Sequence, residues 1–270
     1  IKEDNGIYWY IYKFCVIICI KLNSSSLQVL YLYKRGELLM NQRKSLKELN
    51  LLDKFLFDEA MDDPENVKEN FQRFGAAVGF DPKDLVLSLQ THTTNVRLVT
   101  EEDRGKGFTR PRDYKDVDGL ITNVSGLVLA TFYADCVPLY FVDPVHRAIG
   151  LSHSGWRGTV NRMGEVTLQR MKEAFGTRPS DVWTAIGPSI CQDCYEISED
   201  VAVQFMQAFP GHTSEILIDK GNGKYQLDLW KANEIVLLDA GVKNIEVKLY
   251  PSARHELLVE LNREEVFADI

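Results

Sequence analysis

Residues 127–153 read LVLATFYADCVPLYFVDPVHRAIGLSH, and this stretch decides the fold class. It consists of three apolar runs, at 127–133, 138–142 and 148–152. Short apolar runs rich in β-branched and aromatic residues, bounded by turn signals such as Asp143-Pro144, are typical of buried strands. We therefore predict three consecutive strands in this stretch.

Helical patterns and further short strands flank these three runs. Pro64 opens a helix in which Val67, Phe71, Phe74 and Val78 form one apolar face. Further helices are predicted at 160–175, 200–209 and 229–240, and further strands at 85–89, 96–99, 182–186 and 245–250. Helices and strands in rough alternation predict an α/β (α+β) fold, a single layered domain with helices packed on mixed β-sheets.

Two segments have less regular patterns. Residues 101–118 (EEDRGKGFTRPRDYKDVD) are charged and punctuated by Gly and Pro, which predicts a mobile surface loop near the functional site. The alternation of Tyr225, Leu227 and Leu229 fits either a strand or the opening of the helix at 229–240.

Charge and composition exclude several classes of function. The net charge of −8 and the pI of about 5.3 argue against binding to nucleic acid or to an anionic membrane. The apolar stretch 7–20 contains Lys13 and is shorter than the roughly twenty residues that a membrane helix needs. Five unevenly spaced cysteines form no disulfide framework, which favours a reducing, cytoplasmic setting.

The N-terminal 39 residues differ in character from the rest of the chain. They are rich in Ile, Tyr, Leu and Lys, as translated AT-rich noncoding DNA would be, and Lys34-Arg35-Gly36-Glu37 can be encoded by purine-only codons. Such codons resemble a ribosome-binding site, and Met40 follows closely. We predict that residues 1–39 are a non-native extension and that 40–270 forms a single catalytic domain; the intact mass of the protein from its native host tests this.

Three side chains, His92, Cys136 and His153, carry the strongest chemical signal. Each follows an apolar run directly, and neighbouring strand ends are places where loops converge and ligands bind. Two imidazoles and one thiolate form a full protein ligand set for a catalytic zinc with an open fourth position. The alternative is a small buried Cys with two histidines that have structural partners.

Other polar residues near these three are candidates for substrate binding. Arg157 lies in a Gly-Trp-Arg-Gly turn that suits an anion such as phosphate, although it could instead stack on Trp156. Asp135 could orient a ligand His or cap a strand end. Asp118 could position a substrate hydroxyl or serve as a turn residue. Cys191-Gln-Asp-Cys194 has redox-motif spacing without the expected context.

Five motifs in order resemble one known family. They are QTHTTNV (90–96), DVDGLIT (116–122), ADCVPLYFVDP (134–144), HSGWRGTV (153–160) and AIGPSICQDCYEI (185–197). Together they resemble the YfiH-type family, labelled polyphenol oxidase or multicopper laccase, whose members are regarded as zinc-dependent purine nucleoside phosphorylases that also show adenosine deaminase and methylthioadenosine phosphorylase activity. The match runs best over 62–241.

The resemblance implies a site and a fold. It assigns zinc to His92, Cys136 and His153, and it places Gln90, Asp118, Arg157 and the Gly187-Pro188 loop around the pocket. It also implies a layered fold similar to the catalytic domain of the cytotoxic necrotizing factor deamidases. Thr93 stands where the family commonly has Gly, and Ser154 where it has Ala.

Four functions remain open from the sequence. The first is phosphorolysis of adenosine, inosine, guanosine or methylthioadenosine by a zinc enzyme, a monomer whose partners are the purine nucleoside and phosphate, with adenosine deamination at the same centre. The second is a metal-free cysteine hydrolase or deamidase that uses Cys136 with His153 or His92 as base. Copper oxidation of phenols is disfavoured, because five histidines are too few for a multicopper enzyme. The fourth is a binding module without activity.

Overall fold

The computed structural model describes residues 16–22, 27–32, 68–69, 71–73, 75–76 and 79–245, the first two ranges by their backbone alone. The predicted helix opened by Pro64 lies partly outside these ranges, and its described residues between 68 and 76 are helical. The predicted strand at 245–250 lies outside them except for its first residue.

Strands dominate the described chain, and helices follow mainly after residue 155. The strands are β1 (Val16–Leu22), β2 (Leu27–Leu32), β3 (Leu85–Leu87), β4 (Val96–Leu98), β5 (Gly119–Thr122), β6 (Val128–Tyr133), β7 (Val137–Asp143), β8 (Ala148–Ser154), β9 (Trp183–Ile186), β10 (Glu196–Ser198), β11 (Leu217–Gly221), β12 (Lys224–Leu227) and β13 (Asn244–Ile245). The α-helices are α4 (Trp156–Val160), α5 (Met163–Phe175), α6 (Glu199–Ala208), α7 (Thr213–Ile216) and α8 (Leu229–Asp239). Short 3-10 turns are η1 (Pro82–Asp84), η2 (Glu101–Asp103), η3 (Pro179–Asp181) and η4 (Gln192–Cys194).

These strands form three sheets. The largest has the order β13-β9-β7-β8-β5-β4, with antiparallel pairing from β9 to β5 and parallel pairing at both edges. A second sheet has the order β2-β1-β6-β3, in which β3 runs parallel to β6. The third is the antiparallel sheet β10-β12-β11. The predicted α/β (α+β) class with mixed sheets is confirmed.

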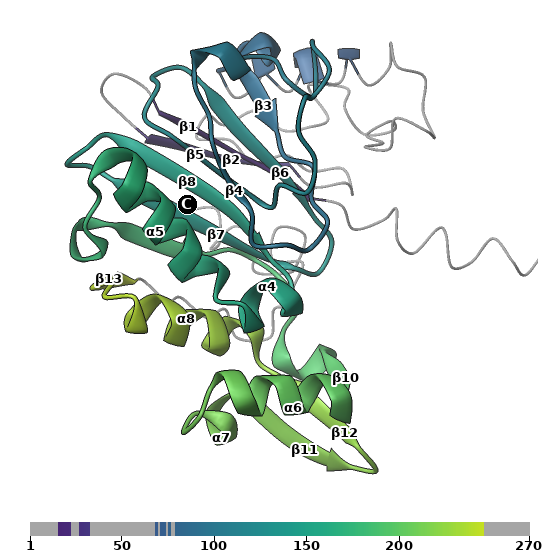
Figure 1. Ribbon diagram of the computed structural model, residues 1–270. Coiled ribbons are helices and arrows are strands. Elements are labelled where there is room, and N and C mark those ends of the chain that lie inside the picture. The colour runs from purple at the N-terminus through teal and green to yellow at the C-terminus, as the bar shows by residue number, and fades with distance from the viewer. Residues whose placement is uncertain are drawn as a thin grey trace, which may run out of the picture.

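The large sheet is covered on both faces (Figure 1). On one face, Leu139 and Phe141 of β7 pack into a core with residues of α5 and α8. On the other face, Tyr140 of β7 packs with Leu129 of β6 and with Leu127, which directly precedes β6. Successive strand residues point to opposite faces, so burial of both faces explains why β7 and β8 read as continuous apolar runs.

The third sheet and helices α6 and α7 lie at one end of the molecule (Figure 1). They share the core of the large sheet, because Phe205 of α6 and Leu227 of β12 belong to the same buried cluster as Val137 and Leu139. The prediction that residues 40–270 form a single domain stays a prediction.

The prediction of one helix at 160–175 was wrong about where this helix begins. The chain forms two helices, α4 and α5, which are separated by Asn161 and Arg162. Arg162 adopts the left-handed conformation, with φ of 60°, and this conformation ends one helix before the next begins. Residues 225–229 were expected to form either a strand or the opening of the next helix. Each expectation is confirmed in part, because strand β12 ends at Leu227 and helix α8 begins at Leu229.

Most of the predicted surface loop at 101–118 is exposed or half-buried, and part of it folds against β3; its mobility stays a prediction. Gly105 N donates to Leu85 O, and Leu87 N donates to Lys106 O, so the loop continues the hydrogen bonding along this strand. Lys106 Nζ bonds the buried carboxylate of Asp103 at 2.7 Å, and Asp103 also accepts from Arg97 at 2.7 Å. Asp103 and Lys106 can be buried in this otherwise mostly exposed or half-buried segment because their opposite charges neutralise each other.

Strands β1 and β2 lie within the predicted non-native extension. β1 pairs with β6 from Val16 opposite Tyr133 to Lys21 opposite Val128. The natural start near Met40 stays a prediction. None of the helices in the described ranges has the length and apolar character needed to cross a membrane.

Candidate metal centre

The first ligand candidate, His92, lies in a tight turn after β3. The side-chain amide of Gln90 makes two hydrogen bonds with the backbone of Phe132 in β6. Its Nε2 donates to Phe132 O at 2.7 Å, and its Oε1 accepts from Phe132 N at 2.8 Å. This pairing anchors the start of the turn. His92 itself has φ of 64°, a left-handed conformation that a non-glycine residue keeps only when its surroundings enforce it.

Asp118 enforces that conformation. Its carboxylate is fully buried and accepts three consecutive backbone N–H groups, from Thr91 (3.1 Å), His92 (3.0 Å) and Thr93 (2.9 Å). Burial alone would raise the pKa of Asp118, but hydrogen bonds from His153, Thr93 and Thr91 outweigh it and lower the pKa to about 2. The carboxylate is therefore ionised at neutral pH.

The same carboxylate fixes the second ligand candidate, His153. The antiparallel register of β5 and β8 places Gly119 opposite Ser152, so the preceding Asp118 lies beside His153. His153 Nδ1 donates to the ionised Asp118 Oδ1 at 2.8 Å, so in the neutral imidazole Nε2 is the nitrogen available as a ligand. His153 was predicted to follow its strand, but it lies inside β8, where it is buried.

Cys136 is the third ligand candidate, in the turn between β6 and β7. Its Sγ lies 3.9 Å from His92 Nε2. Burial, together with the charges of Asp135 and Asp118, raises the pKa of the thiol to about 11 in the metal-free protein. Burial also lowers the pKa of His92, and the nearby His153 and Arg157 add to that effect. His92 is therefore held as the neutral imidazole that a metal requires.

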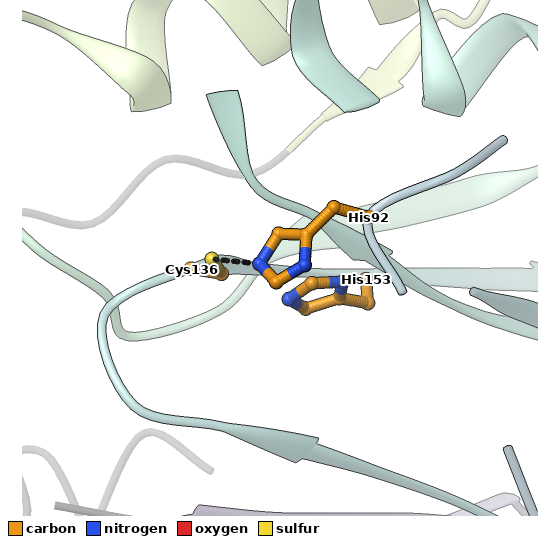
Figure 2. Close-up of side chains that lie close together, drawn as sticks. All are labelled: His92, Cys136 and His153. Atoms are coloured by element: carbon orange, nitrogen blue, oxygen red, sulfur yellow. Dashed lines mark hydrogen bonds between the residues drawn. The ribbon is translucent and has the colours of Figure 1, made fainter. Parts of the chain in front are cut away.

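The three side chains converge on one point (Figure 2). Their ligand atoms all lie within 4.8 Å of one another, and the two imidazole rings meet nearly edge to face with centroids 4.9 Å apart. A tetrahedral zinc would hold such atoms about 3.3–3.6 Å apart, so closing on an ion requires shifts of about 1 Å or less. Within the described part of the chain, no other group of His, Cys, Asp and Glu side chains has this arrangement.

Gly155 leaves the room that these ligands occupy. A Cβ atom at this position would lie 2.9 Å from Cys136 Sγ and 3.1 Å from His92 Cδ2, closer than real Cβ contacts. The backbone of Gly155, with φ of −69°, does not itself require glycine. The glycine is therefore needed for space beside the ligands, and the donor set fits a divalent metal.

Arg157 lies on the exposed side of this centre. Its guanidinium stacks on the ring of Trp156 at 4.3 Å from the centroid, so the stacking that the sequence left open is present. Its positive charge adds to the lowering of the pKa of His92, after burial and the charge of His153, while Asp118 opposes that lowering. Binding of an anion by Arg157 stays a prediction.

A buried polar network holds helix α4, and with it Gly155 and Arg157. Ser154 Oγ donates to Asn233 Oδ1 of α8 at 2.9 Å, and Asn233 Nδ2 donates to Thr159 Oγ1 at 3.1 Å. Thr159 Oγ1 in turn donates to Gly155 O at 3.0 Å. Asn233 was not among the predicted residues, because its partners are 74 and 79 residues away in sequence.

The remaining predicted substrate-binding residues have structural contacts of their own. The Gln90 amide is engaged with β6, as described above. Gly187 packs closely on β7, since a Cβ there would lie 2.9 Å from both Pro138 and Tyr140. Asp135 is exposed, and its carbonyl accepts from Ile190 N at 3.0 Å, which brings the 187–195 segment against the Cys136 turn. Contact of these residues with a substrate stays a prediction.

Two further features near the site bear on the sequence predictions. Cys191 and Cys194 form no disulfide within the described part of the chain. Tyr195 was not predicted as a site residue, yet its pKa is raised to about 12 by burial and by the nearby Cys136 and Asp135. Its position beside the motif Cys191-Gln-Asp-Cys194 was the available signal.

Comparisons with known proteins identify the family of this chain. Residues 43–257 match the family model described as multi-copper polyphenol oxidoreductase laccase. Over 192 residues, the chain is 35% identical to purine nucleoside phosphorylase YlmD of Bacillus subtilis, a match that covers 70% of this chain and 68% of that protein. It is 34% identical over 188 residues to adenosine deaminase RL5 of an unknown prokaryotic organism, covering 69% of this chain and 71% of that protein.

A solved structure extends the comparison to the fold. The crystal structure of Bacillus licheniformis hypothetical protein YfiH superposes with a TM-score of 0.68 at 30% identity, covering 77% of this chain and 79% of that one. The similarity to the cytotoxic necrotizing factor domain stays a prediction. The family match spans most of the chain and includes all three ligand candidates, so this protein belongs to the multi-copper polyphenol oxidoreductase laccase family, the YfiH family.

Proposed function

We propose that this chain is a zinc-dependent purine nucleoside phosphorylase that also deaminates adenosine. The observation that carries the proposal is the convergence of His92, Cys136 and His153, whose ligand atoms lie within 4.8 Å of one another. The names of the relatives, a purine nucleoside phosphorylase and an adenosine deaminase, supply the two reactions. Adenosine, inosine, guanosine and methylthioadenosine are the candidate nucleosides.

In phosphorolysis, a phosphate oxygen attacks C1′ of the pentose. The bond between C1′ and the purine nitrogen breaks, its electron pair leaves with the base, and the base takes up a proton. The products are the free base and pentose 1-phosphate. In deamination, water adds to C6 of adenine and ammonia leaves.

The chain's own residues bind and orient the reactants. Arg157, pre-oriented by its stacking on Trp156, would hold the phosphate at the exposed side of the centre. His92, Cys136 and His153 would hold zinc, which when bound supplies Lewis acidity and lowers the pKa of a water molecule to about 7. Asp118 keeps two of these ligands in place. Gln90, Asp135 and Gly187 are proposed to border the nucleoside.

Zinc fits this donor set better than the copper that the family description suggests. One His₂Cys group can hold a single copper, but a multicopper enzyme needs several sites with further imidazoles. Among the described residues only this one group converges, and the chain has five histidines in all. Phenol oxidation therefore stays disfavoured.

A metal-free cysteine hydrolase is also disfavoured by the geometry. The pKa of Cys136 is raised to about 11, whereas nucleophilic cysteines have lowered pKa values. The 3.9 Å between Cys136 Sγ and His92 Nε2 exceeds the usual contact between nucleophile and base. Both features suit a thiol that releases its proton to solvent when its sulfur binds a metal. We propose a cytoplasmic monomer.

Product analysis on protein of known metal content tests this function. Purified protein is incubated with inosine or adenosine, with and without phosphate, and the base, pentose 1-phosphate and ammonia are measured. We expect one zinc per chain and release of base that depends on phosphate. Cys136→Ser should lose both zinc and turnover, whereas Cys194→Ser, at an exposed cysteine outside the ligand set, should keep both. Turnover by zinc-free protein with covalent labelling of Cys136 would instead support the cysteine hydrolase.

A further inference from the structure

We infer that Asp118 is the positioning residue that sets two of the three metal ligands at once, by fixing the ring nitrogen of His153 that faces the metal and the backbone turn that carries His92. The inference rests on the metal site of the proposed function and concerns no substrate. From the sequence, Asp118 was a candidate for a substrate hydroxyl or a turn position, and Asp135 for orienting a ligand His or capping a strand end. The contacts of the Asp118 carboxylate with both histidine segments give it a role that the sequence did not suggest.

The two oxygens of Asp118 have separate tasks. Oδ1 accepts from His153 Nδ1 at 2.8 Å and from His92 N at 3.0 Å. Oδ2 accepts from Thr91 N at 3.1 Å, from Thr93 N at 2.9 Å and from Thr93 Oγ1 at 2.9 Å. Four N–H donors and the Thr93 hydroxyl, whose single hydrogen can also go to Asp116 O at 3.1 Å, face this one fully buried group. A carboxylate can accept at all these positions because it has two oxygens and no proton.

An amide in the same place, as in Asp118→Asn, cannot do this. If the amide kept its oxygen toward His153, its NH₂ group would face the N–H groups of Thr91 and Thr93, and the turn that holds His92 would be repelled. If the amide were turned around, its NH₂ group would face His153 Nδ1. His153 would then have to accept there and carry its proton on Nε2, the nitrogen that the metal needs. Either orientation removes one ligand.

The turn itself gives an independent reason for this arrangement. His92, the middle residue of the turn, has φ of 64° and so lies in the left-handed region. Consecutive N–H groups around such a residue form a concave anion site. Here the anion is the side chain of Asp118, and the turn and the carboxylate hold each other in place.

The test compares Asp118→Asn with Asp116→Asn. Both substitutions remove one negative charge from the same segment, and Asp116 also contacts the turn, through Thr91 Oγ1 at 2.9 Å. Zinc affinity is measured by competition with a chelator. We expect Asp118→Asn to weaken zinc binding at least 10- to 100-fold, and Asp116→Asn to stay within about three-fold of the unsubstituted protein. Equal effects of the two changes would mean that charge alone matters, and would overturn the inference.

Nitrogen NMR of His153 in the metal-free protein supplies a second readout. At mildly alkaline pH, we expect the proton on Nδ1 in the unsubstituted protein and in Asp116→Asn. In Asp118→Asn, we expect either the proton on Nε2 or, if the amide oxygen stays toward His153, displaced backbone signals of residues 91–93. An unchanged tautomer and an unchanged turn would overturn the inference. A protein that binds zinc and responds in this way but turns over no nucleoside would contradict the proposed function alone.

A milder variant covers the case in which Asp118→Asn does not fold. Thr93→Val removes one O–H donor to Oδ2 and keeps the backbone N–H and the side-chain shape. We expect the fold to be retained and zinc affinity to fall about three- to ten-fold, the effect of one hydrogen bond. Unchanged zinc affinity in folded Thr93→Val, together with an unfolded Asp118→Asn, would overturn the inference.

Discussion

At the scale of single residues, the glycine beside the ligands is as constrained as the ligands themselves. Gly155 follows β8 and is the N-cap of α4, and its missing side chain leaves the space in which Cys136 Sγ and the His92 ring lie. Since its φ of −69° is open to any residue, the constraint comes from the neighbouring atoms and not from the backbone.

We expect Gly155→Ala to weaken zinc binding by at least about ten-fold while the fold is retained. The added Cβ would stand 2.9 Å from Cys136 Sγ and 3.1 Å from His92 Cδ2, so both ligands must move. A displacement of this size is comparable to changes around metal ligands that cost about 10- to 100-fold in affinity. Zinc titration and far-UV circular dichroism measure the two parts of the prediction.

Gly158→Ala is the matched control on the same helix. Its Cβ would meet His153 O at 3.5 Å, an ordinary contact. We expect unchanged zinc affinity and a free energy of unfolding that is higher by up to about 1 kcal/mol, because alanine is favoured over glycine in helices. Full zinc affinity in Gly155→Ala would show that the ligands do not need the space that the structure gives them.

At the scale of elements, burial decided which parts of the fold could be predicted. Strands β6, β7 and β8 were found because both faces of their sheets are covered, which produces long apolar runs. β5 has only four residues, directly after a charged loop, and it was missed. The break at Arg162 was missed because no Gly or Pro marks it. Hydrogen bonding of the 101–118 loop to β3 depends on partners distant in sequence.

The candidate site, like the fold, could be predicted only in part from the sequence. His92, Cys136 and His153 could be proposed from sequence because each stands beside an apolar run, and the structure brings them together. The contacts of Asp118 could not, because they join residues 25 to 35 positions apart through one pair of oxygens. Only the register of β5 on β8 shows that this carboxylate reaches His153.

The loop at 101–118 should make stability depend on pH through Asp103. Burial would raise the pKa of Asp103, but hydrogen bonds from Lys106, Thr100 N and Arg97 outweigh it and lower the pKa to about 2. A carboxyl whose pKa is lower in the folded state stabilises that state above the unfolded pKa of about 4. This stabilisation, about 2 kcal/mol, is lost as the pH falls through the folded value.

We therefore expect Asp103→Asn to lower the free energy of unfolding by about 2 kcal/mol at neutral pH, with the difference shrinking as the pH falls from about 4 toward 2. Urea unfolding at a series of pH values measures this difference. Asp113→Asn is the control, because Asp113 contacts the same Lys106 but is 63% exposed, and a much smaller effect is expected. A difference between Asp103→Asn and the unsubstituted protein that does not vary with pH would contradict the assignment.

At the scale of the whole molecule, one apolar core connects the large sheet to the small one. Phe205 of α6 is fully buried in the cluster that also contains Leu139 and Phe141 of β7. The small sheet therefore has no separate core among the described residues, and its stability depends on the large sheet.

We expect Phe205→Ala to lower the free energy of unfolding by about 3–5 kcal/mol and to leave a single unfolding transition. Far-UV and near-UV circular dichroism should report the same midpoint, because both sheets lose the same core. Val203→Ala on the same helix, at a position that is 40% exposed, should change the free energy by no more than about 0.5 kcal/mol. Two separate transitions would show that the chain folds as two independent units.

The three ligand candidates come from separate turns and strands, and this fact governs the order in which the site can form during biosynthesis. A ribosome-bound chain that has emerged only through Cys136 offers two donors and lacks β8, which carries the third and pairs with β5. Such a nascent chain has no preformed cage, so tight uptake of a cofactor ion must wait until β8 has left the exit tunnel and paired. For the zinc site proposed above, we therefore expect metal binding to follow the emergence and pairing of β8.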